Sequence, residues 1–203
     1  EVNGPFLLGS IVHHLILDYR DNKTLFMAAQ TKAHGATIFK STDFGMNWIP
    51  VKRPPAFSSN KKVAHIYRIT PGHQSEPNVW YAGTSPQGLF RSDDSGDTWH
   101  EVTGFNNHPE FTQWCKSLKE ETLKYEKIHS IMVHPHNPHS LIISMAFGGT
   151  FESMDCGKSW IKMNEGLSIK DIPNSLGRNP HLVLQHPVEP DILYQQNQGG
   201  IFK

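Results

Sequence analysis

The sequence predicts an all-β protein built from repeated four-stranded antiparallel sheets. An octet with the pattern Ser-x-Asp-x-Gly-x-x-Trp occurs three times, and each copy follows a short strand-like run that ends in an aromatic and a charged residue. The 14 prolines and 16 glycines among the 203 residues favour short strands joined by turns over long helices. A chain of this length can bury a substantial core.

The octets, at 41–48, 92–99 and 153–160, are predicted to form structured turns. Their Ser and Asp side chains can accept hydrogen bonds from turn amides, and their Gly can adopt a positive φ. We interpret the octet as structural, because three of the five tryptophans close it and offer a large surface for burial. Calcium binding is the disfavoured alternative, because the octet lacks the dense oxygen ligands of a calcium loop. The repeated positions are Ser41, Asp43, Gly45, Trp48, Ser92, Asp94, Gly96, Trp99, Ser153, Asp155, Gly157 and Trp160.

Three strands are expected before each octet, and a fourth is expected to leave it through the tryptophan. The first strands are expected at 12–18, 63–70, 128–134 and 181–186, and the second strands at 24–30, 78–84, 140–146 and 191–196. The third strands contain the aromatics Phe39, Phe90, Phe151 and Phe202. These aromatics recur at intervals slightly longer than the roughly 40–50 residues of a propeller blade. The pattern predicts a radial array of sheets, a β-propeller.

The chain is expected to form a single partial propeller domain over 1–203, with about three and a half blades. The repeats span approximately 12–52, 63–103, 128–163 and 181–203. Because the chain starts at Glu1 and ends within a strand where a fourth octet is due, we interpret it as an internal fragment of a longer protein. A leader upstream would not be visible, so the sequence assigns no compartment.

Composition argues against several classes of partner. The 19 basic and 19 acidic residues cancel, which disfavours nucleic acid as a partner. The sequence contains no run of about 18 apolar residues, so it predicts no membrane-spanning helix. Cys115 and Cys156 are too few for a disulfide framework. No phosphate-binding glycine loop, zinc-protease helix or serine nucleophile motif is present, so neither a cofactor nor a metal is expected.

Histidines mark the expected first strands. His13, His65, His129 and His181 lie near the start of these strands, and His134 and His186 lie five residues after His129 and His181. The innermost strand of a blade faces the central channel, so these six residues are candidate ligand or channel positions. One hypothesis is a metal or anion site. We favour a polar lining that hydrogen-bonds neighbouring blades, because imidazoles on different blades are expected to be too far apart to share a metal with bonds of about 2.0–2.1 Å.

The connections from fourth to first strands, at 52–62, 107–127 and 164–180, are expected to cross the same mouth of the channel. Ligand sites are usually built from such loops. Within the second connection, Phe111, Trp114, Cys115 and Leu118 have helical spacing and predict a short surface helix.

The octet is the signature of the BNR or Asp-box repeat, and the chain resembles that superfamily of β-propellers. Segments outside the octets resemble a bacterial group whose members are labelled glycosyl hydrolase, sialidase-like or uncharacterised repeat protein. The matching segments include 53–57, 70–73, 80–90 and 193–197. The chain departs from the group's pattern at 177–181, where Gly-Arg-Asn-Pro-His replaces Gly-His-Asp-Pro-His, and at 197–200. If the group's His, Asp or Cys residues serve a metal or catalysis, this chain has lost that role.

The resemblance implies a carbohydrate-active or carbohydrate-binding propeller with its ligand at the channel mouth and, if it is an enzyme, a glycoside hydrolase. The alternative that it implies is a non-enzymatic scaffold for protein partners, similar to sortilin-like receptors and photosystem-assembly propellers. Sialidase activity is disfavoured, because the Arg-Ile-Pro signature is absent and only Arg68 and Arg178 are placed to reach the channel, where three arginines are needed. A hydrolase with two carboxylates remains open. The catalytic candidates are Asp18, Glu76, Arg68 and Arg178, and Glu165 and Asp171 are further channel-side carboxylates.

Overall fold

The computed structural model describes residues 4–109, 126–145, 148–163, 180–197 and 199–203, and the described chain is all-β. Four antiparallel sheets follow one another along the chain, and each is a simple meander in sequence order. Three have four strands and the last has three, which confirms the predicted propeller fragment of about three and a half blades. The short helix α1 (Thr103–Asn106) follows the second sheet.

The strands lie within a couple of residues of their expected positions. The first sheet contains β1 (Ile11–Leu17), β2 (Leu25–Thr31), β3 (Gly35–Ser41) and β4 (Ile49–Pro50). The second contains β5 (His65–Pro71), β6 (Trp80–Ser85), β7 (Leu89–Ser92) and β8 (His100–Glu101). The third contains β9 (Ile128–Val133), β10 (Leu141–Met145), β11 (Gly149–Ser153) and β12 (Ile161–Lys162). The fourth contains β13 (Leu182–Gln185), β14 (Leu193–Asn197) and β15 (Gly200–Phe202).

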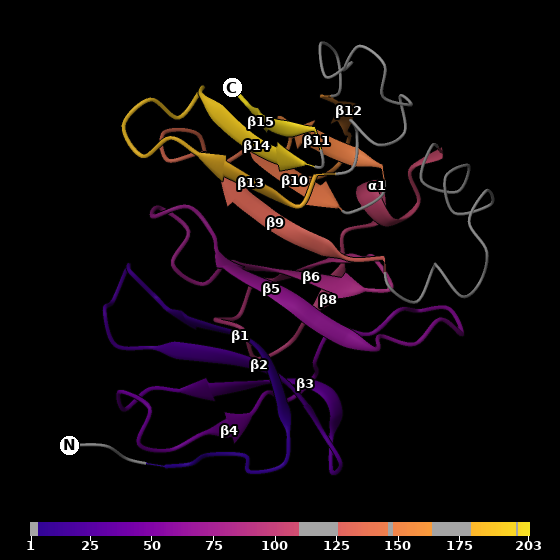
Figure 1. The fold of residues 1–203 in the computed structure, drawn as a ribbon. Helices are drawn as coiled ribbons and strands as arrows, with labels where there is room; N and C mark the ends of the chain where they lie inside the picture. The colour runs from indigo at the N-terminus through magenta and orange to yellow at the C-terminus, as the bar shows by residue number, and fades with distance from the viewer. Residues whose placement is uncertain (1–3, 110–125, 146–147, 164–179, 198) are drawn as a thin grey trace.

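The first strands of neighbouring sheets contact one another in the order β1, β5, β9 and β13. Figure 1 shows the sheets stacked in sequence from indigo to yellow, with these four strands crossing the middle of the stack. This arrangement makes them the inner strands of the blades. The predicted helix at 111–118 lies outside the described residues.

Large side chains fill the space between neighbouring sheets. Phe26 from the first sheet packs on Trp80 from the second, with ring centroids 4.3 Å apart. Between the second and third sheets, Phe105 of α1 packs on Phe151 and Trp160. Each sheet has an apolar face that must be buried, and it is buried against the adjacent sheet. Apolar layers therefore alternate with sheets along the stack.

A β-bulge interrupts the pairing of three inner strands at nearly the same place. The register shifts leave His13 in β1, Tyr67 in β5 and His129 in β9 without a directly opposed residue. The bulges therefore make these three residues structurally equivalent. His65 lies two residues before the equivalent residue of its strand, Tyr67, and so is not the structural counterpart of His13 that the sequence repeat predicts. A bulge bends its strand and redirects its side chain, which sequence spacing does not reveal.

Among the described residues, no helix has the length and apolar character needed to cross a membrane.

Candidate functional site at the start of the inner strands

The three octets share the hydrogen bonds from turn amides to Ser and Asp, but only the second and third add a bond from the Trp indole, since Trp48 Nε1 has no partner among the described residues. In the second copy, Ser92 Oγ donates to Asp94 Oδ1 at 2.8 Å and accepts from the Gly96 amide at 3.0 Å. Asp94 also accepts the Thr98 amide at 2.8 Å, and the Trp99 indole donates to the Gly96 carbonyl at 2.9 Å. The Ser and Asp oxygens of the octet are thus already bonded within the turn. The octet therefore stabilises the turn and leaves few polar groups for a ligand.

Hydrogen bonds lower the pKa of the octet carboxyl groups. The pKa of Asp43 is lowered to about 2, chiefly by the Asn47 amide, and that of Asp155 to about 2, chiefly by the Ser159 hydroxyl. At Asp94, burial raises the pKa, but the bonds from Thr98 and Ser92 outweigh it and bring the pKa to about 2. A carboxylate that accepts several hydrogen bonds is stabilised in its charged form.

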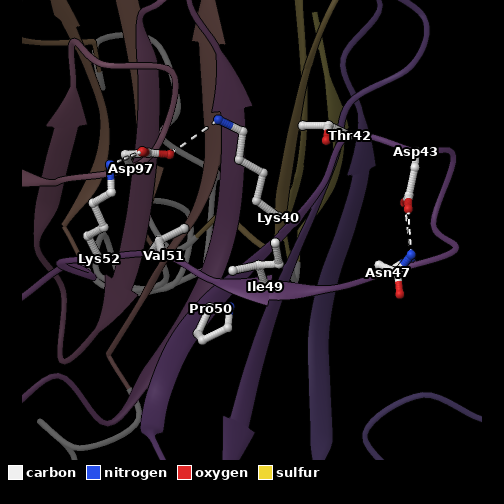
Figure 2. A pocket seen from close by; sticks show the side chains of 9 residues that line it. All are labelled: Lys40, Thr42, Asp43, Asn47, Ile49, Pro50, Val51, Lys52 and Asp97. Carbon is white, nitrogen blue, oxygen red and sulfur yellow. Dashed lines mark hydrogen bonds and ion pairs between the residues drawn. The ribbon is translucent and has the colours of Figure 1, made fainter.

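A cavity of about 300 Å³ lies between β4 and the octet of the second sheet (Figure 2). Lys40 Nζ donates to the Ser95 carbonyl at 2.7 Å and lies 3.3 Å from Asp97 Oδ1, while Lys52 Nζ lies 2.8 Å from Asp97 Oδ2. Figure 2 shows both lysines turned toward Asp97. These charges hold one blade to the next at the outer rim, far in sequence and structure from the inner-strand histidines.

The catalytic candidate Asp18 belongs to a buried clamp between the first two blades. Its carboxylate accepts from Arg20 Nε at 2.8 Å and from Arg20 Nη2 at 3.0 Å, and both side chains are at most 8% exposed. Arg20 Nη1 donates to the carbonyls of Glu76 and Val79, each at 3.0 Å. The guanidinium also lies 4.7 Å from the centroid of the Trp80 ring. Asp18 therefore links its own blade to the next one.

The candidate Glu76 is likewise paired, since its Oε1 lies 3.6 Å from Arg91 Nη2. Asp18 follows the end of β1, and Glu76 follows the end of β5. Both carboxylates therefore lie at the opposite end of the inner strands from His13 and His65. Arg178, Glu165 and Asp171 lie outside the described residues.

The structure brings His13 and His65 together across the first two blades. His13 Nε2 and His65 Nδ1 are 2.9 Å apart, and the two ring centroids are 4.6 Å apart. Tyr67 completes an aromatic cluster with its ring centroid 4.8 Å from that of His13. Lys127 Nζ lies 4.5 Å from the Tyr67 ring centroid, within the range of a cation–π contact. Burial, His65 and Lys127 all lower the pKa of His13.

His129 has a different environment and a fixed tautomer. The Val183 amide donates to Ser130 Oγ at 3.3 Å, and Ser130 Oγ lies 2.9 Å from His129 Nδ1. The Pro180 carbonyl can only accept, so His129 Nε2 donates to it at 2.9 Å, and Nδ1 of the neutral imidazole accepts from the Ser130 hydroxyl. Burial lowers the pKa of His129 to about 4 despite the Pro180 bond, with smaller contributions from Lys127, His181 and Arg68.

The other predicted histidines are not part of one continuous ring. His181 is exposed, and its amide donates to the Gln196 carbonyl at 2.8 Å. His134 and His186 follow the ends of β9 and β13, at the opposite end from His13. His134 Nε2 lies 3.5 Å from Asp191 Oδ1. In the part of the chain that the structure describes, no three His, Cys, Asp or Glu side chains are arranged to hold a metal.

The sequence analysis missed His14, Tyr67 and Lys127 as members of this site. His14 Nδ1 accepts the Ile69 amide at 3.3 Å, across the boundary between the first two blades. Burial and the neighbouring Arg68 lower the pKa of His14 to about 4. These residues lie close in sequence to the repeated histidines, which is the signal that could have indicated them. The sequence does not reveal the bulges, and the bulges determine which side chains come into contact.

Comparison with solved structures shows the β-propeller fold. The GH74 xyloglucanase from Xanthomonas campestris matches with a TM-score of 0.62 and 20% identity, over 94% of this chain and 27% of that chain. YCF48 from Cyanidioschyzon merolae matches with a TM-score of 0.54 and 12% identity, over 96% of this chain and 52% of that one. YCF48 bound to D1 peptide matches with a TM-score of 0.52 and 14% identity, over 93% and 51%.

The chain thus spans about a quarter of the GH74 xyloglucanase and about half of the YCF48 chains. At these identities the likeness establishes the fold alone. No protein-family model matches the sequence, and no curated protein matches it either.

Proposed function

We propose that the chain is part of an Asp-box β-propeller that binds a carbohydrate at the start of its inner strands. The Asp-box assignment is supported by three octets in which turn amides donate hydrogen bonds to the Ser and Asp side chains in the same way. The binding proposal rests on one observation, the cluster in which His13 and His65 from neighbouring blades meet beside Tyr67. An aromatic face rimmed by hydrogen-bonding groups suits a sugar ring, which has apolar C–H faces and a hydroxyl edge.

Binding is favoured over hydrolysis by the engagement of the candidate carboxylates. Asp18 is held by Arg20 and Glu76 by Arg91, both at the far end of the inner strands. A glycoside hydrolase requires two carboxyl groups about 5–10 Å apart that flank the scissile bond, and one must act as an acid. Asp18 and Glu76 instead contact arginines and lie at the end of the inner strands opposite the histidine cluster, where they do not flank a ligand bound there.

Isothermal titration calorimetry of the protein against a panel of neutral and charged oligosaccharides tests the proposal. Tyr67→Ala should weaken binding of any bound sugar at least ten-fold, because it removes the central ring of the cluster. Tyr19→Ala is the matched control, since Tyr19 is 57% exposed and lies outside the cluster. The proposal is wrong if no sugar binds or if both variants bind equally well. Turnover of an aryl-glycoside panel would instead support a hydrolase.

A second candidate is a non-enzymatic scaffold that holds a protein partner. It is favoured by the match to YCF48 bound to D1 peptide, which covers 93% of this chain. Fluorescence anisotropy with extended peptides tests it. Peptide binding that persists in Tyr67→Ala and is not displaced by sugar would support the scaffold, and competition by a sugar would support the carbohydrate site.

A further inference from the structure

One inner-strand position links each blade to the next by a side-chain acceptor. His14 in β1 and Ser130 in β9 each follow the bulge residue of their strand. Each accepts a backbone amide from the next inner strand at 3.3 Å, His14 from Ile69 and Ser130 from Val183. The repeated role is acceptance of a backbone N–H between blades.

Arg68 occupies the same position in β5, directly after the bulge residue Tyr67. A guanidinium has five N–H donors and no acceptor, so Arg68 cannot make the interblade bond that His14 and Ser130 make. Its Nε is buried and has no hydrogen-bond partner. The second blade therefore lacks the link at this position and carries a cation there. Departures of this kind from a local structural rule are typical of functional positions.

Within the described part of the chain, neither Arg68 nor Lys127 forms an ion pair with a carboxylate. Burial is the cause that lowers the pKa of Arg68, but a guanidinium remains protonated in proteins.

The histidines around these cations are arranged to remain neutral. Burial is the first cause of the lowered pKa at His13, His14 and His129, followed by neighbouring positive groups at each. Lys127 contributes at His13 and His129, and Arg68 contributes at His14 and His129. Arg68 and Lys127 are therefore the two fixed positive charges of this region. A partly buried guanidinium with free donors favours an oxyanion, because bidentate hydrogen bonds to carboxylate or sulfate oxygens satisfy it.

We propose that the ligand of this site carries an anionic group, a carboxylate or a sulfate ester, bound by Arg68 with Lys127 nearby. This inference rests on the proposed carbohydrate-binding function and specifies its ligand class as an acidic sugar. The sugar ring lies against Tyr67 and His13, and the oxyanion accepts from the Arg68 guanidinium. Arg68 and Lys127 together set the preference for charge.

Calorimetric titration with methyl β-D-glucuronide, methyl β-D-glucoside and methyl β-D-glucoside 6-sulfate tests this directly. The first two differ only in the carboxylate, so the glucuronide should bind at least ten-fold tighter, and its affinity should fall as salt is raised. Tighter binding of the sulfate ester than of the glucuronide would identify sulfate as the anionic group. Arg68→Gln and Lys127→Gln should each reduce the preference for the charged sugar over the glucoside. Arg53→Gln, at an exposed position near the outer octet, is the control.

The outcomes separate the two proposals. Equal binding of the glucoside, the glucuronide and the sulfate ester would overturn the acidic-ligand inference and leave the carbohydrate site standing. Binding of sodium sulfate or acetate that Arg68→Gln abolishes, without binding of any sugar, would support the anion site and overturn carbohydrate as the ligand. If neither sugars nor these ions bind, both proposals fail. The comparison of glucuronide with glucoside on the unaltered protein decides the case even if Arg68→Gln does not fold.

Discussion

At the scale of single residues, His129 shows how a histidine of the repeat becomes part of the scaffold. Its two ring nitrogens are used by Ser130 and by the Pro180 carbonyl, and Ser130 in turn binds the Val183 amide. This relay crosses from the third blade to the fourth. It requires the neutral imidazole, because Nδ1 must accept a hydrogen bond.

The low pKa of His129 predicts a loss of stability in mild acid. The folded pKa is about 4 and the ordinary value is 6.5, so between these values the unfolded chain binds the proton more readily than the folded one. The contribution is fully present above pH 6.5 and is lost as pH falls toward 4, with an upper bound of roughly 3 kcal/mol at about 1.4 kcal/mol per pKa unit.

Urea denaturation of the protein from pH 7 to pH 4 checks this. His129→Gln should flatten the profile relative to the unaltered protein, whereas His100→Gln, at an exposed imidazole, should leave the slope unchanged. An unchanged slope in His129→Gln would contradict the assignment.

At the scale of elements, the glycines of the second and third octets place their turns against the preceding blade. Gly96 has a φ of +82°, and a Cβ added to it would lie 2.5 Å from the Phe26 ring of the first sheet. Gly157 similarly faces Val102 of the second sheet, at 2.8 Å. Gly45 has a comparable φ of +84°, but an added Cβ would make only ordinary contacts, with Trp48 and Leu25 of its own sheet.

Gly96→Ala and Gly45→Ala therefore separate backbone strain from blade packing. Both substitutions should cost about 1–2 kcal/mol of unfolding free energy for the left-handed backbone. Gly96→Ala should cost about 1–3 kcal/mol more, because its methyl group forces Phe26 out of a packed layer. Chemical denaturation of the two variants measures the difference, and equal losses would show that the close approach to Phe26 does not contribute.

The elements were the most predictable part of the molecule. The octets, the aromatics before them and the positions of the strands follow from a repeat written directly in the sequence, because turn chemistry and alternation are local. The bulges at His13, Tyr67 and His129 are not local in this sense, since they depend on pairing with the second strands. The site could therefore be predicted as a histidine-rich end of the inner strands, but not as the cluster of His13, His65 and Tyr67 beside Arg68.

At the scale of the whole molecule, the stack of blades has two outer faces with different coverage. On the first sheet, Leu7 and Trp48 cover Met27, Ala29 and Phe39. Other apolar side chains on the outer sheets stay exposed, including Leu15 at 56%, Leu17 at 45%, Leu184 at 54% and Ile201 at 78%. Exposed apolar faces of this kind promote association.

Residues 1–203 produced alone should therefore self-associate in a concentration-dependent manner. The double substitution Leu17→Lys and Leu184→Lys should shift the chain toward monomer in sedimentation velocity, because charges on both faces oppose stacking. Met154→Lys is the control, since Met154 is also 54% exposed but lies in an octet turn. A monomeric unaltered chain, or an equal response to the control, would contradict this expectation.

The interblade acceptor at His14 and Ser130 has a consequence for how such an array can diversify. When a repeat is duplicated, every copy inherits the contact that joins it to its neighbour, and each copy is initially interchangeable. A single blade can exchange that contact for a new side chain while the remaining blades keep the assembly in register. Arg68 in the second blade fits such an exchange. There the interblade hydrogen bond is replaced by a side chain that is free to take on a new role.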